Sequence, residues 1–222
     1  NRSASDPVFT DVKVCPSCKA SLETPLACSA CGALVSGASV EGPFEIFGLP
    51  RAYALDKSDL RRRLLRFSRL VHPDFFATAG ETQRAEAERA SAALNVAHET
   101  LADDASRADW IVRDLGGPDE LAERAMPQEF LMEVLDWNET LDAARSAQPG
   151  APERAAIQRL ASELEARRGA LFEDVARRLT PLPASTDAAA LRETRKLLNA
   201  ARYVEKTLSE IAALRVEQSL SR

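Results

Sequence analysis

Hydrophobic residues recur with helical spacing over most of the chain after residue 57. Between residues 57 and 71, Leu60, Leu64, Phe67 and Val71 form one narrow stripe when successive residues are turned by about 100°. A proline then ends this helix, because proline disfavours helical geometry at the residue before it. A second helix is predicted from about residue 81 to 101, and its inward alanines permit close packing against the first. The pattern predicts an antiparallel helical hairpin with an exposed turn.

Three longer amphipathic helices are predicted in residues 119–222. Proline-containing breaks at 149–152 and 181–183 separate them. The first has a core stripe that includes Phe130 and Trp137. Amphipathic helices with short connections form antiparallel bundles. The chain is therefore predicted to be mainly α, with a helical hairpin followed by a three-helix bundle.

All four cysteines fall close together, in the spacing C-x2-C-x9-C-x2-C. Two such turns supply four thiolates to one tetrahedral ion, which leaves no open position for catalysis. The spacing favours one structural Zn²⁺ per chain over disulfides or free thiols in an intracellular protein, and iron fits the same thiolate cage. We therefore predict a zinc-ribbon-like hairpin segment whose metal ligands are Cys15, Cys18, Cys28 and Cys31.

Composition narrows the classes of function. The 222 residues carry a formal net charge of −5, with a pI near 5.3, which argues against a general nucleic-acid binder. Neither G-x-G-x-x-G nor G-x-x-x-x-G-K-[ST] occurs, so a nucleotide-binding loop is not expected. No apolar run is long enough to span a bilayer, and no signal-peptide segment is found. We expect a soluble intracellular protein without a membrane or nucleic-acid partner.

The first helix of the hairpin has a concentrated positive face. A charged face is most often a solvated surface. Here five arginines lie within nine residues with no acidic residue among them, which suits an acidic partner. The face opposite the apolar stripe holds Arg62, Arg66 and Arg69, and Arg61 and Arg63 flank it.

Several apolar residues of the bundle do not fit their core stripes. Three residues of its first helix lie roughly 100 to 160° away from the stripe, beside two carboxylates, and Tyr203 of the last helix is displaced by about 120°. A wide core face is one explanation, and single exposed apolar residues are ordinary. The clustering favours a protein-binding patch. Its first-helix members are Leu131, Met132, Leu135, Asp136 and Glu139.

Several motifs of the hairpin resemble those of a J domain, the module that activates DnaK-type chaperone ATPases. They are the Phe44–Leu49 opening, the basic helix, His72-Pro73-Asp74, and Asn95-x-Ala97 leading to Leu101-Ala102-Asp103. The resemblance implies that the chaperone contacts His72, Pro73 and Asp74, with Arg62, Arg66 and Arg69 as charge contacts. It implies no enzymatic activity. A catalytic His72 is disfavoured because no second histidine lies nearby in the sequence.

Phe130-Leu131-Met132-Glu133, at this distance after a J domain, resembles the HscB-type co-chaperones of iron–sulfur cluster assembly. Pro43-Phe44-x-x-Phe47-Gly48-Leu49-Pro50, His72-Pro73-Asp74-Phe75-Phe76 and Arg195-Lys196-Leu197 with Arg202-Tyr203 extend the likeness over residues 43–215. The resemblance implies a DnaK/HscA-type chaperone and an IscU-type scaffold as partners. The implied scaffold contacts are Leu131, Met132, Leu135, Asp136, Glu139 and Tyr203.

These features divide the chain into a metal-binding segment (1–40), a J domain (41–118) and a scaffold-binding bundle (119–222). We expect a monomer or weak dimer in the bacterial cytoplasm, with the mitochondrial matrix as the second choice. Three alternatives are kept: a J protein with a different client, a zinc-ribbon nucleic-acid module and a redox-active thiol pair. The nucleic-acid alternative is weakened because residues 10–35 contain no aromatic side chain for stacking.

Overall fold

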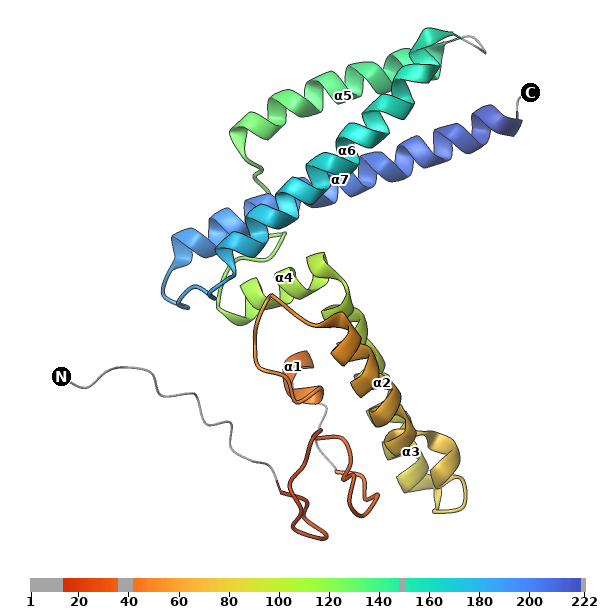
Figure 1. Cartoon of the computed structure of the whole chain (residues 1–222), viewed down its shortest axis with the longest axis vertical. Helices are drawn as coiled ribbons and strands as arrows, with labels where there is room; N and C mark the ends of the chain where they lie inside the picture. Colours follow the sequence, from red (N-terminus) through yellow and green to blue (C-terminus); the bar gives the residue numbers. More distant parts are fainter. Residues whose placement is uncertain (1–13, 36–41, 148–150, 221–222) are drawn as a thin grey trace, which may run out of the picture. The chain divides into compact units, whose positions relative to one another are not determined.

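The structure, a computed structural model, describes residues 14–35, 42–147 and 151–220. Within these ranges it contains helices and isolated β-bridges but no β-strand, so the predicted mainly α fold is confirmed (Figure 1). No helix in the described part of the chain has an apolar stretch sufficient to cross a bilayer. The helices are α1 (Pro43–Ile46), α2 (Lys57–Val71), α3 (Glu81–Ala102), α4 (Asp104–Asp114), α5 (Gln128–Ser146), α6 (Pro152–Arg178) and α7 (Ala188–Leu220).

The chain folds as two compact units. Unit 1 comprises Asn1–Arg51 and Leu55–Asp103, and unit 2 comprises Ala52–Ala54 and Asp104–Arg222. The predicted division at residues 118 and 119 places α4 in the J domain, whereas α4 packs against α6 and α7 within unit 2. Part of the predicted 1–40 segment, residues 1–13 and 36–40, lies outside the described residues. The three-part division stays a prediction.

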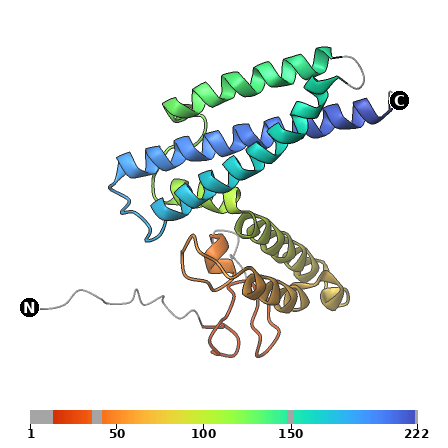
Figure 2. The same cartoon turned by 45° about the horizontal axis from the view of Figure 1, so that its top comes forward.

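Helices α2 and α3 form the predicted hairpin of unit 1, and Figures 1 and 2 both show them side by side. The α2 bounds agree with the predicted 57–71. Asp56 begins the helix because its carboxylate accepts hydrogen bonds from the backbone N–H groups of Ser58 at 2.8 Å and Asp59 at 3.1 Å. The buried positions of the two helices are Leu60, Phe67, Val71, Ala87, Leu94, Ala97 and Leu101.

The short helix α1 packs against α3 and closes one end of this core. Phe44 and Phe47 are both fully buried, and the Phe47 ring lies 6.2 Å from the ring of Phe67 on α2. The backbone then turns at Gly48, where φ is +60°, a left-handed conformation that favours glycine. The apolar opening in the sequence therefore anchors the hairpin at its aromatic end.

Residues 14–35, called the knuckle segment below, consist of two similar turns. In the first turn, the backbone N–H of Cys15 donates to Ala20 O at 2.8 Å, and that of Lys19 to Cys15 O at 2.9 Å. Cys28, Gly32 and Ala33 repeat this pattern in the second turn. Lys19 and Gly32 both have positive φ, at 63° and 73°. One bridge closes each turn, so the segment is two knuckles in series.

Helices α5, α6 and α7 form the bundle of unit 2, with α6 packed against both neighbours (Figure 2). The predicted three-helix bundle is confirmed. The sequence pattern did not predict α4, which buries Ala108, Ile111 and Val112. A short helix between two longer patterns has too few turns for its stripe to stand out.

A buried arginine ties α7 to α4 and to the following loop. Arg195 is 1% exposed, and its guanidinium lies 2.6 Å from a carboxylate oxygen of Asp109. Its Nε donates to Pro118 O at 2.9 Å. A buried charge is tolerated only when it is paired, and loss of one partner strongly destabilises the fold. The arginine in the Arg195-Lys196-Leu197 motif is therefore a structural residue.

Replacing Arg195 by Ala should destabilise unit 2 by about 3 kcal/mol, because Asp109 and Pro118 O lose their buried partner. Both tryptophans, Trp110 and Trp137, belong to unit 2, so their fluorescence during urea unfolding reports on this unit alone. The control is Arg192→Ala on the same helix, which removes the contact of an exposed arginine with Glu123 at 3.8 Å and should cost less than about 1 kcal/mol. Equal losses in the two variants would contradict the role given to Arg195.

Candidate functional site

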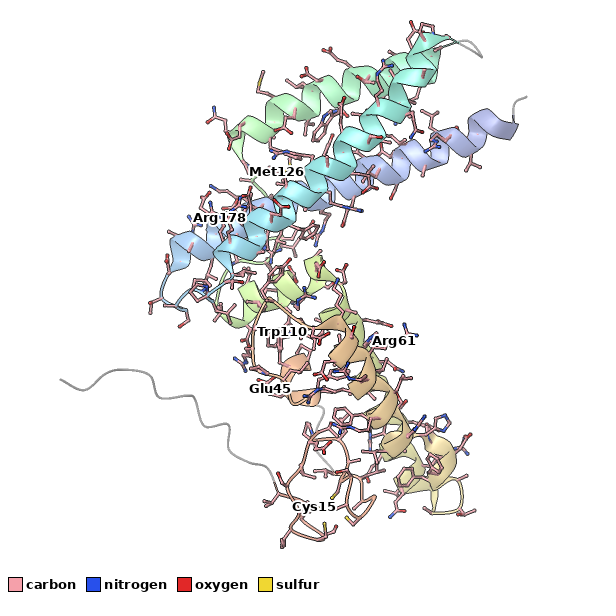
Figure 3. All side chains as sticks on the ribbon, in the orientation of Figure 1. Cys15, Glu45, Arg61, Trp110, Met126 and Arg178 are labelled. Atoms are coloured by element: carbon pink, nitrogen blue, oxygen red, sulfur yellow. The ribbon has the colours of Figure 1, made fainter. Side chains whose placement is uncertain are left out.

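The four cysteines form one cage in unit 1. Their sulfur atoms all lie within 4.8 Å of one another. The Sγ atoms of Cys15 and Cys31 are 3.7 Å apart, and those of Cys18 and Cys28 are 3.6 Å apart. Zinc–sulfur bonds of about 2.3 Å in a tetrahedron place the sulfurs about 3.8 Å from one another. The predicted set of four cysteines is thus positioned to hold one metal ion, near Cys15 in Figure 3.

Two thiols of this cage, those of Cys15 and Cys31, have strongly shifted pKa values. The backbone N–H of Cys18 is the main cause that lowers the pKa of Cys15 to about 6. For Cys31, the backbone N–H of Ala33 favours the thiolate, but the Cys18 thiol, burial and the other two thiols oppose it and raise the pKa to about 12. Four thiolates at this spacing repel one another, so full ionisation needs a cation among them. The donor set fits a divalent metal.

His72, Pro73 and Asp74 lie in an exposed turn at the end of α2, as the sequence predicts. Pro73 begins a short 3-10 helix, Pro73–Phe76, and His72 Nδ1 accepts a hydrogen bond from the backbone N–H of Asp74 at 3.3 Å. The side chains of His72 and Asp74 are 53% and 91% exposed. The Phe75 ring is exposed and stands edge-on to the imidazole at 6.1 Å. A short capped turn therefore presents imidazole, carboxylate and aromatic groups to solvent.

The five arginines of α2 are not equivalent. Asp59 pairs with Arg62 at 3.0 Å and with Arg63 at 2.8 Å. This pairing lowers the pKa of Asp59, with the hydrogen bond from Arg63 as the main cause. Arg63 also donates to Phe47 O at 3.1 Å, so it holds the turn after α1 in place. Arg66 pairs with Glu23 of the knuckle segment at 2.5 Å. The helical pattern did not predict these partners, because they come from other elements or from the first turn of the helix.

The off-stripe residues of α5 are solvent-exposed in unit 2. Leu131, Met132 and Leu135 are 45%, 66% and 56% exposed, and Asp136 and Glu139 beside them are exposed too. The core stripe of the same helix is separate and buried; its members are Phe130, Trp137, Leu141 and Ala144. A wide core face therefore does not account for the three apolar residues.

Tyr203 of α7 lies at one edge of this patch. Its ring stands edge-on to Phe130 at 6.2 Å, and its hydroxyl exchanges hydrogen bonds of 3.2 and 3.3 Å with the side-chain amide of Asn138 on α5. Asn138 follows Leu131 by seven residues, two helical turns, and so shares its side of the helix. The structure thus joins Tyr203 to the Leu131 side of the patch. Asn138 was not predicted from the sequence, since an exposed amide on a helix has no pattern of its own.

The opposite side of α5 is held by an arginine from α6. Arg167 makes two hydrogen bonds to the Glu133 carboxylate, both 2.8 Å long, and its guanidinium lies 5.7 Å from the centre of the Phe130 ring. Paired, planar bonds of this kind restrict orientation as well as distance. The rotation of α5, and with it the direction in which the patch faces, is set by Phe130 and Glu133.

Known proteins are similar to this chain in sequence and in fold. Residues 126–212 match the family described as the HSCB C-terminal oligomerisation domain. The co-chaperone protein HscB homologues of Burkholderia multivorans and Burkholderia thailandensis are each 33% identical over 172 residues, which cover 77% of this chain and 91% of each relative.

Two solved structures of HscB proteins have similar folds. The human co-chaperone protein HscB superposes with a TM-score of 0.72 at 23% identity, over 92% of this chain and 100% of that one. Chaperone HscB from Vibrio cholerae gives a TM-score of 0.64 at 26% identity, over 81% and 99% of the two chains. One third of the aligned residues are identical to those of the Burkholderia proteins, over nearly the whole length of those proteins. This chain therefore belongs to the HscB co-chaperone family.

Proposed function

We propose that this protein is a co-chaperone of iron–sulfur cluster assembly with two partner-binding surfaces. Unit 1 contains a J domain that stimulates the ATPase of a DnaK/HscA-type chaperone, and the bundle of unit 2 binds an IscU-type scaffold. The observation that carries the proposal is that each unit exposes a predicted contact cluster off its core stripe: the His72–Asp74 turn on one and the α5 patch on the other. The co-chaperone names of the Burkholderia relatives support it.

The chaperone-binding surface combines a rigid turn with positive charge. His72 caps the turn and Pro73 restricts its backbone, so His72 and Asp74 need little ordering on binding. Arg62, Arg66 and Arg69 on α2 supply a field that attracts an acidic chaperone surface and raises the rate of encounter. The protein contributes no catalytic residue; ATP hydrolysis takes place on the chaperone.

The scaffold-binding surface combines apolar anchors with a charged rim. Leu131, Met132 and Leu135 offer flexible apolar side chains, and Tyr203 adds an aromatic ring fixed by Phe130 and Asn138. Asp136 and Glu139 set the charge at the edge. Protein interfaces concentrate their binding energy in such central apolar and aromatic residues within a polar rim.

Because both surfaces belong to one chain, delivery of the scaffold to the chaperone takes place within a single complex. A scaffold bound to unit 2 is held near the chaperone bound to unit 1, which raises its effective concentration at the chaperone's peptide site. The chaperone then grips the scaffold while the His72–Asp74 turn favours hydrolysis, and the cluster passes to an acceptor. We propose that the protein acts in the bacterial cytoplasm, with the mitochondrial matrix as the alternative.

The knuckle segment is proposed to hold one structural Zn²⁺ through Cys15, Cys18, Cys28 and Cys31, and iron satisfies the same geometry. With all four positions taken by sulfur, the ion supplies folding free energy and no reactive site. The nucleic-acid and redox alternatives make different predictions: retention of DNA or RNA on a filter at low salt, and disulfides instead of metal in freshly purified protein.

His72→Gln should reduce stimulation of the chaperone ATPase by about tenfold or more, equal to about 1.4 kcal/mol, because the turn loses its imidazole. Steady-state phosphate release measures the effect, and calorimetry should show unchanged scaffold binding. His98→Gln is the matched control, since it makes the same exchange at the chain's other histidine. Loss of stimulation and scaffold binding together would contradict the separation of the two surfaces.

Combined replacement of Leu131, Met132 and Tyr203 by Ala should weaken scaffold binding by about 100-fold, because three anchors are removed. Isothermal calorimetry with the IscU-type scaffold of the same organism measures it. The control replaces Val96 and Leu121, which are 62% and 75% exposed, by Ala and should leave binding unchanged. Binding that survives in the triple variant would exclude the patch, and no binding by the unchanged protein would indicate a different client.

Cys15→Ser should release the metal, because three remaining thiolates bind it more weakly. Elemental analysis should find about one zinc per unchanged chain and almost none in the variant. Amide hydrogen exchange should accelerate across residues 14–35. Ser29→Ala, which alters the second knuckle without removing a ligand, is the control. Two disulfides and no metal in freshly purified protein would favour a redox role.

A further inference from the structure

The knuckle segment is docked on the rest of unit 1. Thr24, Leu26 and Ala27, between its two turns, are 2%, 1% and 1% exposed, although the outer residues of both turns are solvent-accessible. Figures 1 and 2 both show the segment next to α1. Twenty-two residues held by one metal have little core of their own, so this buried middle depends on the neighbouring elements.

Gly48 is the point of closest approach. A Cβ atom at this position would lie 2.5 Å from the backbone carbonyl oxygen of Glu23, a separation that side chains do not adopt. Arg63 of α2 holds the same turn by donating to Phe47 O at 3.1 Å and Gly48 O at 3.4 Å. The glycine therefore lets the knuckle backbone lie directly on the turn after α1.

The docked segment places negative charge on the basic helix. The Glu23 carboxylate lies 2.5 Å from the guanidinium of Arg66, which is 51% exposed. The metal-bound cage gives the knuckle segment further negative charge, because the four negative charges of the thiolates exceed the two positive charges of a divalent ion. In the described part of the chain, no acidic side chain pairs with Arg61 or Arg69. The knuckle segment thus neutralises one of the arginines that the proposed function assigns to the chaperone.

We propose that the knuckle segment is a metal-dependent restraint on the chaperone-binding face of α2. While the metal is bound, Glu23 pairs with Arg66, and the face binds through Arg69 and through Arg62, which shares the Asp59 carboxylate with Arg63. When the metal is lost, the segment unfolds, Glu23 leaves Arg66, and the face gains one positive charge. Coupling to the chaperone is then stronger in the metal-free protein. This inference rests on the proposed function, because the chaperone is the partner whose binding is restrained.

The first test separates the ion pair from the metal. Glu23→Gln keeps all four cysteines and should tighten chaperone binding by about threefold, the range of an exposed ion pair. Removal of the metal by chelation under reducing conditions should tighten it by about tenfold at low salt, and the gain should shrink at high salt as charges are screened. Removing the metal from the Glu23→Gln protein should tighten binding only by the remaining factor of about three, because the Glu23 charge is already gone and only the charge of the cage is left to lose. Glu88→Gln, which breaks the Arg84–Glu88 pair on α3, is the control of equal charge change.

The second test undocks the segment without changing any charge or ligand. Gly48→Ala pushes a methyl group against the Glu23 carbonyl and should tighten chaperone binding as metal removal does. Gly116→Ala introduces a side chain at a similar positive φ, +83°, with no atom within 4 Å, and so controls for backbone strain alone. Equal or weaker chaperone binding by the metal-free or Gly48→Ala protein would overturn the restraint.

The free protein provides a readout that needs no chaperone. The NMR signal of the Arg66 side-chain Nε–H should shift when the metal is removed and should shift in the same direction in Glu23→Gln. An Arg66 signal that shifts neither on metal removal nor in Glu23→Gln would overturn the docking contact. If no form binds the chaperone, the proposed function fails and the restraint with it, while a responsive Arg66 signal shows that the docking itself is correct.

Discussion

Burial of one apolar stripe on each long helix is the constraint on which both units depend. On α2 the stripe contains Phe67 and Val71, and on α5 it contains Phe130 and Trp137. Once these side chains are placed inside, the rotation of each helix about its axis is determined, and every other residue has a defined direction. The basic face of α2 and the apolar patch of α5 are consequences of that rotation. Local contacts such as the Arg167–Glu133 pair then hold it.

Arginine side chains have three different structural roles in this protein. Arg195 is buried and joins α7 to α4, so its removal affects folding. Arg63 is half-buried and fastens the turn after α1 through backbone carbonyls. Arg66 is exposed and faces the knuckle segment through Glu23. The guanidinium group suits all three tasks because it donates several bonds in one plane and keeps its charge when partly desolvated. A count of arginines cannot separate these roles.

The sequence was informative wherever a structural rule acts over a few residues. Helical spacing predicted α2 with its bounds, cysteine spacing predicted the cage, and Pro73 predicted the end of the hairpin's first helix. It was less informative where the contact joins distant segments. Asn138 and Tyr203 are 65 positions apart, and neither stands out until the two helices are packed together. The short helix α4 was missed because its stripe has too few repeats to rise above chance.

The sequence by itself determined the helical class, the breaks between helices, the four-cysteine ligand set and the residues that fail to fit a core stripe. Each of these follows from backbone geometry or ligand chemistry within a few turns of chain. Only the tertiary structure decided which arginine of α2 meets Glu23, that Asn138 holds Tyr203, and that the knuckle segment rests on Gly48. These contacts depend on how separate elements pack, since a side chain's partner across an interface is set by the positions of two backbones and is not encoded in either segment alone.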